Sequence, residues 1–300
     1  ISGPTASGKS SLALKVAKEV NSAIINADSV QIYQDLPILS AQPSIQERQE
    51  TQHELYSILS GSKSFSLVDW LKLAQEKIDQ AFLENKLPII VGGTGLYLSK
   101  LIDGINKIPK ISDKIKKVSR ELFQQGDKEI IKKELLKLGD DKDLIKDLDL
   151  YRLIRRFEVL KQTGKNMSYW HLQPKTKFYN LEQFIHFNIE PDRDLLYKKC
   201  NLRFKKMLDN GAILEVKNLM HRGTLKNSPP ASKTIGFLEI GRYLKKEISE
   251  EKMIEITTQK TRNYAKRQLT WFRNQIKDSH KICDDSTKSL TEILNLLDLN

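Results

Sequence analysis

The sequence begins with Ile1-Ser2-Gly3-Pro4-Thr5-Ala6-Ser7-Gly8-Lys9-Ser10, and its residues 3–10 match the pattern Gly-x-x-x-x-Gly-Lys-Ser. In a loop of this pattern the backbone N–H groups surround phosphate oxygens, the Lys reaches the terminal phosphates, and the Ser binds Mg²⁺. Residues 11–19 carry apolar side chains at helical spacing, so the loop precedes a helix whose N-terminus favours anions. The alternative, an ordinary glycine-rich turn, does not account for this helix. The motif therefore predicts a phosphate site, without specifying which group is transferred.

Segments with strand and helix patterns alternate after this first helix. Residues 23–27 and 87–91 are short apolar runs typical of buried strands, and residues 69–84 have a helical apolar period. This alternation predicts an α/β fold, a P-loop NTPase-like parallel sheet core with helices on both faces. Residues 31–66 are expected to be irregular. Because the sequence starts within the motif and without Met, we expect most of the strand that leads into the loop to lie upstream.

The pattern changes between residues 108 and 180. Helical repeats of apolar residues occupy 111–122 and 144–154, and a strand pattern returns only at 184–189. Residues 106–180 carry 19 Lys and Arg against 11 Asp and Glu, a net of +8 in a chain whose net charge is +12. A lysine-rich surface throughout would not explain this clustering. We therefore predict a discontinuous core of residues 1–107 and 181–300, with an inserted all-helical, basic domain at 108–180.

Composition narrows the class of protein further. The positive net charge of the chain points to a polyanionic partner. Its two cysteines, Cys200 and Cys283, suggest no disulfide framework, and its five histidines lack metal-ligand spacing. No apolar run reaches transmembrane length and no signal peptide is evident, so a cytoplasmic protein without a membrane partner is expected.

Two charged residues stand out as candidates for chemistry. Arg203 falls on the apolar arc of a helix that starts after Asp192, so it has either a buried carboxylate partner or a bound anion. Asp28 follows the strand at 23–27 and, with the phosphate loop and Thr94, should lie at the carboxyl edge of the sheet. It could hold a metal, accept a proton, or only cap a turn.

Basic and aromatic residues are mixed near the carboxyl end of the chain. Residues 252–281 contain eight Lys or Arg and two acidic residues, interleaved with Tyr264, Trp271 and Phe272. Such a mixture suits a nucleic-acid backbone with a stacking surface. Aromatic residues at helical spacing are more often core, and we favour core packing for Trp271 and Phe272. Together these features indicate an Mg²⁺-dependent enzyme that binds a phosphorylated small molecule and a nucleic acid.

The same residues, in this order, resemble the bacterial type of the tRNA dimethylallyltransferase (tRNA isopentenyltransferase) family. The similar segments are the loop at 3–10, Asp28-Ser29-Val30-Gln31-Ile32-Tyr33, Val91-Gly92-Gly93-Thr94-Gly95-Leu96-Tyr97, Arg152-Leu153-Ile154-Arg155 with Thr163-Gly164-Lys165, Lys233-Thr234-Ile235-Gly236-Phe237, and residues 261–273. The resemblance implies transfer of a dimethylallyl group from dimethylallyl diphosphate to N6 of the adenosine on the 3′ side of the tRNA anticodon. It also implies that the target base is flipped out of the anticodon loop.

The resemblance assigns roles residue by residue. Asp28 and Thr94 would be catalytic, with Asp28 taking the N6 proton. The diphosphate would be bound by Thr5, Ala6, Ser7, Gly8, Lys9, Ser10 and Arg203, with Mg²⁺ held by Ser10. The tRNA anticodon stem-loop would be bound by Ser29, Val30, Gln31, Arg152, Leu153, Ile154, Arg155, Lys233, Thr234, Ile235, Gly236, Phe237 and Leu238. No obligate protein partner is implied, and a monomer is expected.

The sequence departs from the family pattern in residues 34–43, in Gln52-His53-Glu54-Leu55, and at Arg156, where Ala is common. These departures concern loop contacts around 35–55 rather than the chemistry. Three other functions are consistent with part of the sequence. An adenylate isopentenyltransferase would not need the basic insertion, a small-molecule kinase would turn over ATP, and a tRNA-binding protein with a decayed site would transfer nothing.

Overall fold

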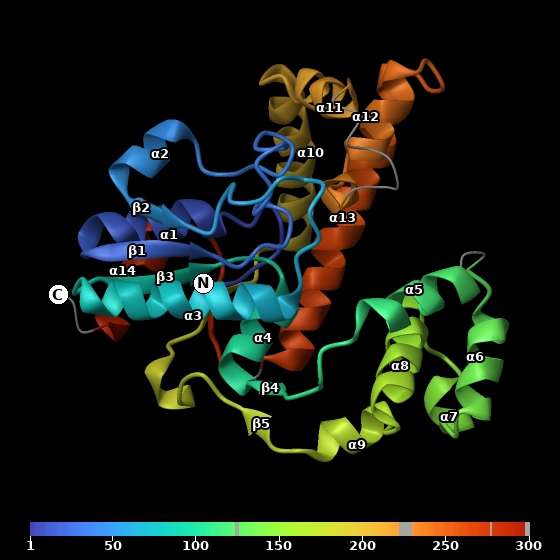
Figure 1. Cartoon of the computed structure of the whole chain (residues 1–300). Helices are drawn as coiled ribbons and strands as arrows, with labels where there is room; N and C mark the ends of the chain where they lie inside the picture. Colours follow the sequence, from blue (N-terminus) through green and yellow to red (C-terminus); the bar gives the residue numbers. More distant parts are fainter. Residues whose placement is uncertain (124–125, 222–229, 277, 298–300) are drawn as a thin grey trace. The chain divides into compact units, whose positions relative to one another are not determined.

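Residues 1–123, 126–221, 230–276 and 278–297 are described by the structure, a computed structural model (Figure 1). The chain divides into two units. The first, which we call the core unit, comprises Ile1–Ile102 and Tyr179–Asn300, and the second, the helical unit, comprises Asp103–Phe178. No helix in these described ranges is both long and apolar enough to cross a membrane.

A parallel sheet forms the centre of the core unit. Its strands are β1 (Ser22–Asn26), β2 (Gln52–Glu54), β3 (Leu87–Val91), β6 (Phe187–Ile189) and β7 (His280–Ile282). In the first part β1 lies between β2 and β3, with Ile24 opposite both His53 and Ile89. Ser2 forms parallel bridges to Gly92 after β3 and to Asn188 in β6, and β6 pairs with β7. Ser2 therefore joins the two parts, and the phosphate loop leaves the middle of the sheet.

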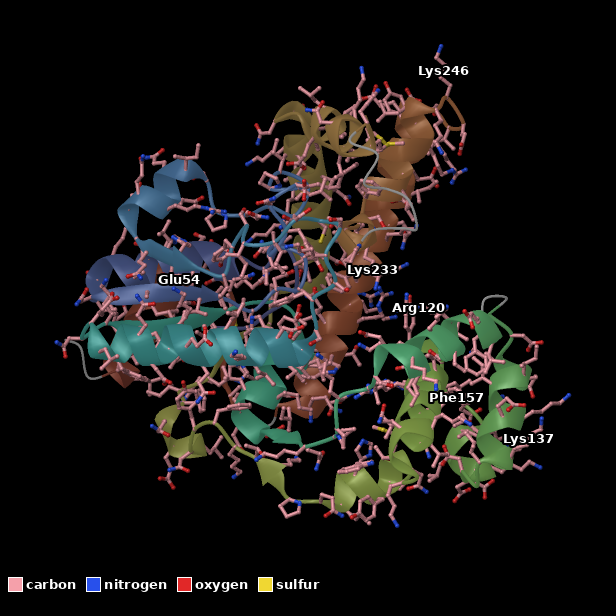
Figure 2. All side chains as sticks on the ribbon, in the orientation of Figure 1. Glu54, Arg120, Lys137, Phe157, Lys233 and Lys246 are labelled. Carbon is pink, nitrogen blue, oxygen red and sulfur yellow. The ribbon has the colours of Figure 1, made fainter. Side chains whose placement is uncertain are left out.

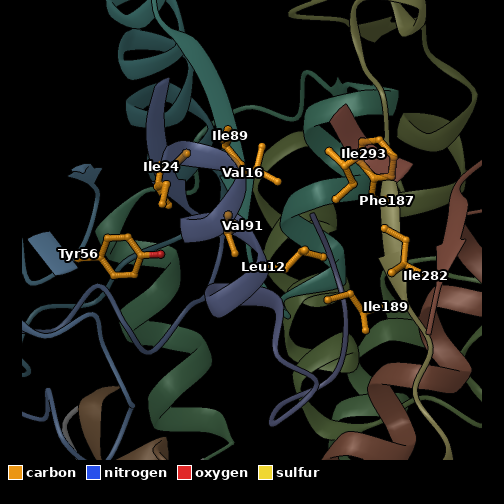
Figure 3. Packing of buried hydrophobic residues seen from close by; sticks show 12 residues of the cluster. Leu12, Val16, Ile24, Tyr56, Ile89, Val91, Phe187, Ile189, Ile282 and Ile293 are labelled. Carbon is orange, nitrogen blue, oxygen red and sulfur yellow. The ribbon is translucent and has the colours of Figure 1, made fainter. Parts of the chain in front are cut away.

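Helices cover both faces of this sheet, as the sequence predicts. On one face, α1 (Lys9–Glu19) and α14 (Thr287–Leu296) contact each other, and Leu12 and Val16 of α1 pack on Ile24 and Val91 (Figure 3). On the other, α3 (Leu67–Leu83) lies along β1 and β3 (Figure 1), and its Trp70 is fully buried. Truncating a side chain such as Leu12 to Ala in a core of this kind costs about 2–5 kcal/mol.

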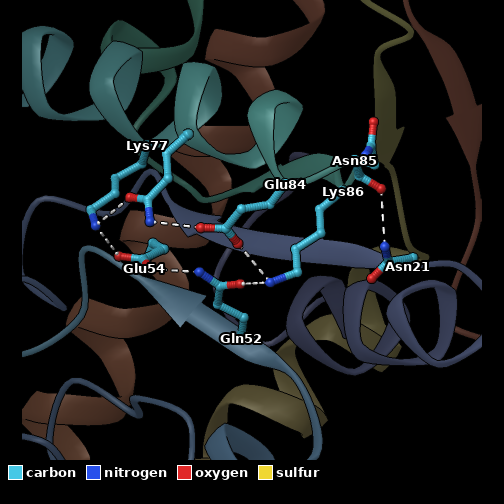
Figure 4. A network of polar contacts seen from close by, with 8 residues as sticks. Asn21, Gln52, Glu54, Lys77, Glu84, Asn85 and Lys86 are labelled. Carbon is cyan, nitrogen blue, oxygen red and sulfur yellow. Dashed lines mark hydrogen bonds and ion pairs between the residues drawn. The ribbon is translucent and has the colours of Figure 1, made fainter.

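The prediction that residues 31–66 are irregular is wrong in part. They contain α2 (Ile45–Glu50), which begins with a capping box formed by Ser44 and Glu47, and the edge strand β2. Polar side chains hide this strand from a hydrophobicity pattern: Gln52 accepts a hydrogen bond from Lys86 at 2.7 Å, and Glu54 pairs with Lys77 of α3 at 3.0 Å (Figure 4). An edge strand can be stabilised in this way with little apolar burial.

The second segment of the core unit is mainly helical. After the short 3-10 helix Leu181–Gln183 and β6, the chain forms α10 (Arg193–Asp209), α11 (Ala212–His221), a 3-10 turn (Pro230–Lys233), α12 (Phe237–Leu244) and α13 (Glu250–Gln275). Asp192 caps α10 as predicted, and its carboxylate accepts hydrogen bonds from the Asp194 and Leu195 amides. Strand β7 was not predicted in the basic carboxyl segment, where Lys277 lies outside the described residues.

In α13 the two neighbouring aromatic residues take different environments. Phe272 is core, at 1% exposure, as predicted. Trp271 is half-buried, and its ring lies against Gly95 at the start of α4 (Gly95–Asp103) so closely that an added Cβ there would meet it at 2.1 Å. The tight contact explains why a glycine follows Thr94.

The helical unit consists of α5 (Asp113–Leu122), α6 (Lys128–Lys137), α7 (Lys142–Ile145), α8 (Leu150–Thr163) and α9 (Met167–Leu172). Its core gathers Ile131 and Leu135 of α6 around Leu153 and Phe157 of α8. Figure 2 shows Phe157 inside this unit, whereas Lys137 points away from it. A two-residue antiparallel pair, β4 (Ile105–Asn106) with β5 (Lys175–Thr176), joins its incoming and outgoing chains, so the described residues of this unit are not all-helical as predicted.

The single helical repeat predicted over 144–154 is wrong. The helix breaks after Ile145, and Asp149 caps a new helix, α8, by accepting a hydrogen bond from the Arg152 amide at 2.9 Å. Asp at this position competes with helix continuation because its side chain satisfies a free N–H of the next helix. Tyr151, expected on the apolar stripe, is 75% exposed.

Candidate active site

The phosphate loop runs from Gly3 to the first turn of α1. Gly8 caps α1 with a φ of 96°, a left-handed conformation in which a side chain is strained, and its carbonyl accepts a hydrogen bond from Leu12. A Cβ at Gly8 would also lie 2.7 Å from the carboxyl carbon of Asp285. Glycine is thus favoured at position 8 both by the backbone conformation and by the close approach of the Asp285 side chain. The helix N-terminus that it starts is an anion-binding position.

Two cations, Lys9 and Arg203, lie at this loop. Lys9 is buried at 8% exposure, and burial, with a smaller effect of Arg203, lowers its pKa to about 8 against the opposing effect of Asp28. Burial also lowers the pKa of Arg203, whose Nη1 donates to Thr5 Oγ1 at 2.8 Å. Within the described ranges Arg203 forms no ion pair with a carboxylate. Of the two alternatives for Arg203, the geometry favours a bound anion.

Asp28 lies directly after β1 in a turn that its neighbours fix. The fully buried Asn26 accepts a hydrogen bond from the Asp28 amide at 2.8 Å and donates to the Asp28 carbonyl at 3.1 Å. One carboxylate oxygen of Asp28 accepts from the Val30 amide at 3.0 Å. The turn therefore holds the carboxylate in place. Asp28 is also one of the residues that line a cavity.

Thr94 lies at the end of the neighbouring strand and is tied to the Asp28 turn. Its hydroxyl accepts a hydrogen bond from the Ser29 amide at 3.0 Å, and its own amide donates to the Ala27 carbonyl at 3.2 Å. The strands approach so closely that a Cβ at Gly92 would lie 2.1 Å from the Ala27 oxygen. Asp28 and Thr94 are thus brought together, with the Thr94 hydroxyl bonded to the backbone beside Asp28.

Two cavities meet at the two cations. One, of about 350 Å³, is lined by Asp28, Ser29 and Val30 together with residues of α10, α13 and the segment 233–235. The other, of about 430 Å³, lies along Ala6, Gly8, Ser10 and the lysines of α10. Lys9, Gln31 and Arg203 line both cavities. We call them the carboxylate cavity and the loop cavity. An anion at the loop can therefore be adjacent to a second ligand beside Asp28.

The other predicted contacts in the core unit differ in exposure. Lys233, Thr234 and Ile235 line the carboxylate cavity. Gly236 caps α12, Phe237 is buried in the core, and Leu238 is 60% exposed. The side-chain Nε2 of Gln31 donates to the Ser40 and Ala41 carbonyls at 3.0 and 2.7 Å. Gln31 therefore holds the 38–41 loop, and Phe237 supports its neighbours from the core.

Within the helical unit, the four predicted tRNA contacts lie on α8. Arg152 and Arg155 are exposed, and Arg152 lies 3.4 Å from Asp149. Leu153 is fully buried in the core of this unit, and Ile154 is half-buried against it. The side chains available to a partner at these positions are therefore those of the two arginines.

The sequence analysis associated residues 252–281 with nucleic-acid binding but assigned no individual site residue to α13. Thr257, Thr261, Tyr264 and Arg267 line the carboxylate cavity, and Gln268 hydrogen-bonds the phosphate loop. Positions 257, 261 and 264 share one helix face by their spacing, a signal that is present in the sequence. The hydroxyls of Thr234 and Thr257 are buried without a partner among the described residues. A ligand in this cavity can supply that partner.

A magnesium ion fits the loop cavity only with ligands from a bound phosphate. The described residues contain no group of three or more His, Cys, Asp or Glu that could hold a metal. Ser10 is exposed in the loop cavity, which Asp285 also lines. Mg²⁺ usually combines one or two protein oxygens with substrate phosphates and water. The donor set is therefore suitable for Mg²⁺ that arrives with a phosphorylated ligand.

The model of a family described as IPP transferase matches residues 31–275. A tRNA dimethylallyltransferase of Pelagibacter ubique is 41% identical over 277 residues, which cover 92% of this chain and 88% of the relative. That of Rickettsia canadensis is 39% identical over 297 residues, 98% of this chain and 90% of the relative. This chain belongs to the tRNA dimethylallyltransferase family.

Solved structures of the family agree with the fold. The tRNA isopentenylpyrophosphate transferase of Staphylococcus epidermidis has a TM-score of 0.69 and 31% identity, covering 99% of this chain and 97% of that chain. A eukaryotic dimethylallyltransferase acting on tRNA has a TM-score of 0.82 and 25% identity, covering 99% of this chain and 77% of that one. The P-loop-like α/β fold predicted from the sequence is thereby confirmed.

Proposed function

We propose that this family member transfers a dimethylallyl group from dimethylallyl diphosphate to N6 of the adenosine on the 3′ side of the tRNA anticodon. The observation that carries the proposal is the meeting of the two cavities at Lys9 and Arg203. The loop cavity suits the diphosphate, and the carboxylate cavity suits a base beside Asp28. The allyl carbon would lie where the two cavities join.

The loop residues would stabilise the leaving group. As the allylic C–O bond breaks, negative charge develops on the diphosphate, and Lys9, Arg203 and the backbone N–H groups of residues 8–10 can stabilise it. Lys9 is buried, Arg203 is half-buried, and within the described ranges Arg203 forms no ion pair with a carboxylate, so both cations can attract an anion strongly. Ser10 would hold Mg²⁺, which when bound contributes further charge stabilisation to the diphosphate.

Asp28 would activate the nucleophile. The N6 lone pair is delocalised into the purine ring, so the amine attacks carbon only weakly by itself. A carboxylate that accepts a hydrogen bond from N6 raises its electron density and takes the proton as the N–C bond forms. The turn formed with Asn26 and Val30 would keep the carboxylate in position, and Thr94 would hold that turn through Ser29.

The anticodon stem-loop would be bound by exposed cations and by the entrance of the carboxylate cavity. Arg152 and Arg155 would contact phosphates on the stem, as the excess charge of the helical unit suggests. Lys233 and Ile235 would contact the loop around the flipped adenosine, and the unpartnered hydroxyls of Thr234 and Thr257 are suited to hydrogen-bond a base. Family membership indicates tRNA as the substrate, and the individual contacts to the stem and loop are our proposal.

One assay tests the proposed function. The chain is incubated with labelled dimethylallyl diphosphate, Mg²⁺ and either an unmodified anticodon stem-loop RNA with adenosine 3′ of the anticodon or AMP. We expect label in the RNA and none in AMP. Equal labelling of AMP would instead indicate an adenylate isopentenyltransferase. An RNA with guanosine at the target position is the matched control and should remain unlabelled.

A further inference from the structure

The carboxamide of Gln268 bridges two backbone segments that are far apart in the sequence. Gln268 lies on α13 and is only 6% exposed. Its Oε1 accepts a hydrogen bond from the Thr5 amide at 2.8 Å, and its Nε2 donates to the Gly93 carbonyl at 2.8 Å. One side-chain group thereby joins the phosphate loop to the end of β3.

The two bridged segments belong to different halves of the site. Thr5 Oγ1 also accepts a hydrogen bond from Arg203 Nη1, and Arg203 lines the loop cavity proposed for the diphosphate as well as the carboxylate cavity. Gly93 precedes Thr94, whose hydroxyl accepts from the Ser29 amide next to Asp28. Gln268 therefore connects the residues proposed to hold the leaving group with those proposed to hold the nucleophile.

The contact leaves little room for a different arrangement. A Cβ at Gly93 would lie 2.4 Å from Gln268 Nε2, so the glycine permits the close approach of the amide. A carboxamide offers an acceptor and a donor in one plane, as this bridge requires. A carboxylate offers only acceptors and would face the Gly93 oxygen, whereas Leu offers neither and leaves the Thr5 amide and the buried Gly93 carbonyl without this partner.

We infer that Gln268 is a positioning residue that sets the separation between the diphosphate and the base for transfer. This inference rests on the proposed function. Gln268 acts through Thr5 and Gly93 and contacts no reacting atom. Its effect should therefore fall on the rate of the transfer step more than on RNA binding. A misplacement of about 1 Å between reacting groups lowers rates by about 100-fold.

The first experiment compares Gln268→Leu with Gln275→Leu, a matched change at an exposed position on the same helix. We measure kcat and KM for labelling of the stem-loop RNA, and the affinity for inorganic diphosphate with Mg²⁺ by calorimetry. Gln268→Leu is expected to lower kcat about 100-fold with the KM for RNA changed less than about threefold. Gln275→Leu should match the wild type. Wild-type kcat in Gln268→Leu would overturn the inference.

The second experiment uses Gln268→Glu, because a protonated carboxyl can replace both hydrogen bonds. Its O–H would donate to Gly93 and its carbonyl would accept from Thr5, whereas the ionised form would not. The activity of Gln268→Glu relative to the wild type should therefore rise as the pH falls. The charged residues of the site, Lys9, Arg203 and Asp28, are present in both proteins, so the ratio reports the titration introduced at residue 268. A ratio independent of pH would contradict the inference.

The outcomes separate this inference from the proposed function. If the wild type labels no RNA, the proposed function fails, and diphosphate binding still tests the bridge. Gln268→Leu should bind diphosphate at least about tenfold more weakly than Gln275→Leu, because Thr5 loses its partner. Equal diphosphate affinity in these two variants would overturn the bridge in that case. If Gln268→Leu does not fold, the pH ratio of Gln268→Glu decides.

Discussion

Lys9 and Arg203 in the core unit and Arg152 and Arg155 in the helical unit are held in opposite ways. Lys9 is buried and Arg203 is half-buried, and burial lowers the pKa of both. Arg152 and Arg155 are exposed, in a segment where basic residues outnumber acidic ones 19 to 11. Buried charge is worth more per residue because the dielectric around it is low, whereas exposed charge acts through numbers and is screened by salt. The difference suggests that chemistry and RNA affinity are divided between the units.

The largest effect should come from Asp28→Asn. Asparagine keeps the shape of the side chain but cannot take the N6 proton, so transfer should fall by about 10³-fold or more. Binding of the stem-loop RNA, measured by fluorescence anisotropy, should stay within about threefold because the core carboxylate contributes little to phosphate contacts. Asp209→Asn, at an exposed position on α10, is the control. A comparable loss of RNA affinity would mean that Asp28 positions RNA instead.

A buried cation of the helical unit, Arg156, is an exception to this comparison and can be tested by itself. Arg156 donates two hydrogen bonds to Asp140, at 2.8 and 2.5 Å, and the Asp140 side chain is fully buried. Arg156→Met should destabilise this unit by about 3–5 kcal/mol, since it leaves a buried charge unpaired. The double variant Arg156→Met/Asp140→Leu should recover most of the loss. Hydrogen exchange of α6 and α8 measures both, and equal protection in the single variant and wild type would contradict the assignment.

The pH dependence of diphosphate binding sharpens the contrast. Burial places the Lys9 pKa near 8, below its ordinary value of 10.5, so Lys9 is charged below that pH and loses its proton above it. The affinity for inorganic diphosphate should therefore decrease by up to about tenfold per pH unit as the pH rises above 8. In Lys9→Arg the residue stays charged, and the part of the slope due to Lys9 should disappear. Equal slopes in the two proteins would contradict a titrating Lys9.

The smallest effect should come from a single exposed cation. Arg152→Ala removes about one phosphate contact, so RNA affinity should fall several-fold and the slope of log K against log salt should decrease by about 1. Lys137→Ala, at another exposed position of the helical unit, tests whether location matters as well as charge. An unchanged salt slope in Arg152→Ala would show that Arg152 does not contact phosphate.

The parts of the fold with a strong local signal were predictable. The loop follows from its motif, β1 and β3 from short apolar runs, and α3 from apolar periodicity, and Asp192 marks the start of α10. Strand β2 was missed because its polar side chains are satisfied by Lys86 and Lys77 rather than by burial. The break between α7 and α8 was missed because the apolar repeat continues through the cap at Asp149.

The site was predictable where a motif carries it and less so where tertiary contacts do. The motifs named Asp28, Thr94 and Lys9, which the structure places on the loops of neighbouring strands. They also named Leu153 and Phe237, whose side chains are buried, since a motif does not distinguish a contact from its support. Gln268 could not be assigned because its partners, Thr5 and Gly93, are more than 170 residues away in the sequence.

The division between the units is tested most directly by the transfer rate of Arg152→Ala/Arg155→Ala at saturating RNA. In a single-turnover experiment with labelled dimethylallyl diphosphate, RNA is added well above its dissociation constant for the variant. We predict weaker RNA binding but a rate constant within about twofold of the wild type, because the exposed arginines supply affinity rather than chemistry. A rate constant at saturation that falls as much as the affinity would contradict the division.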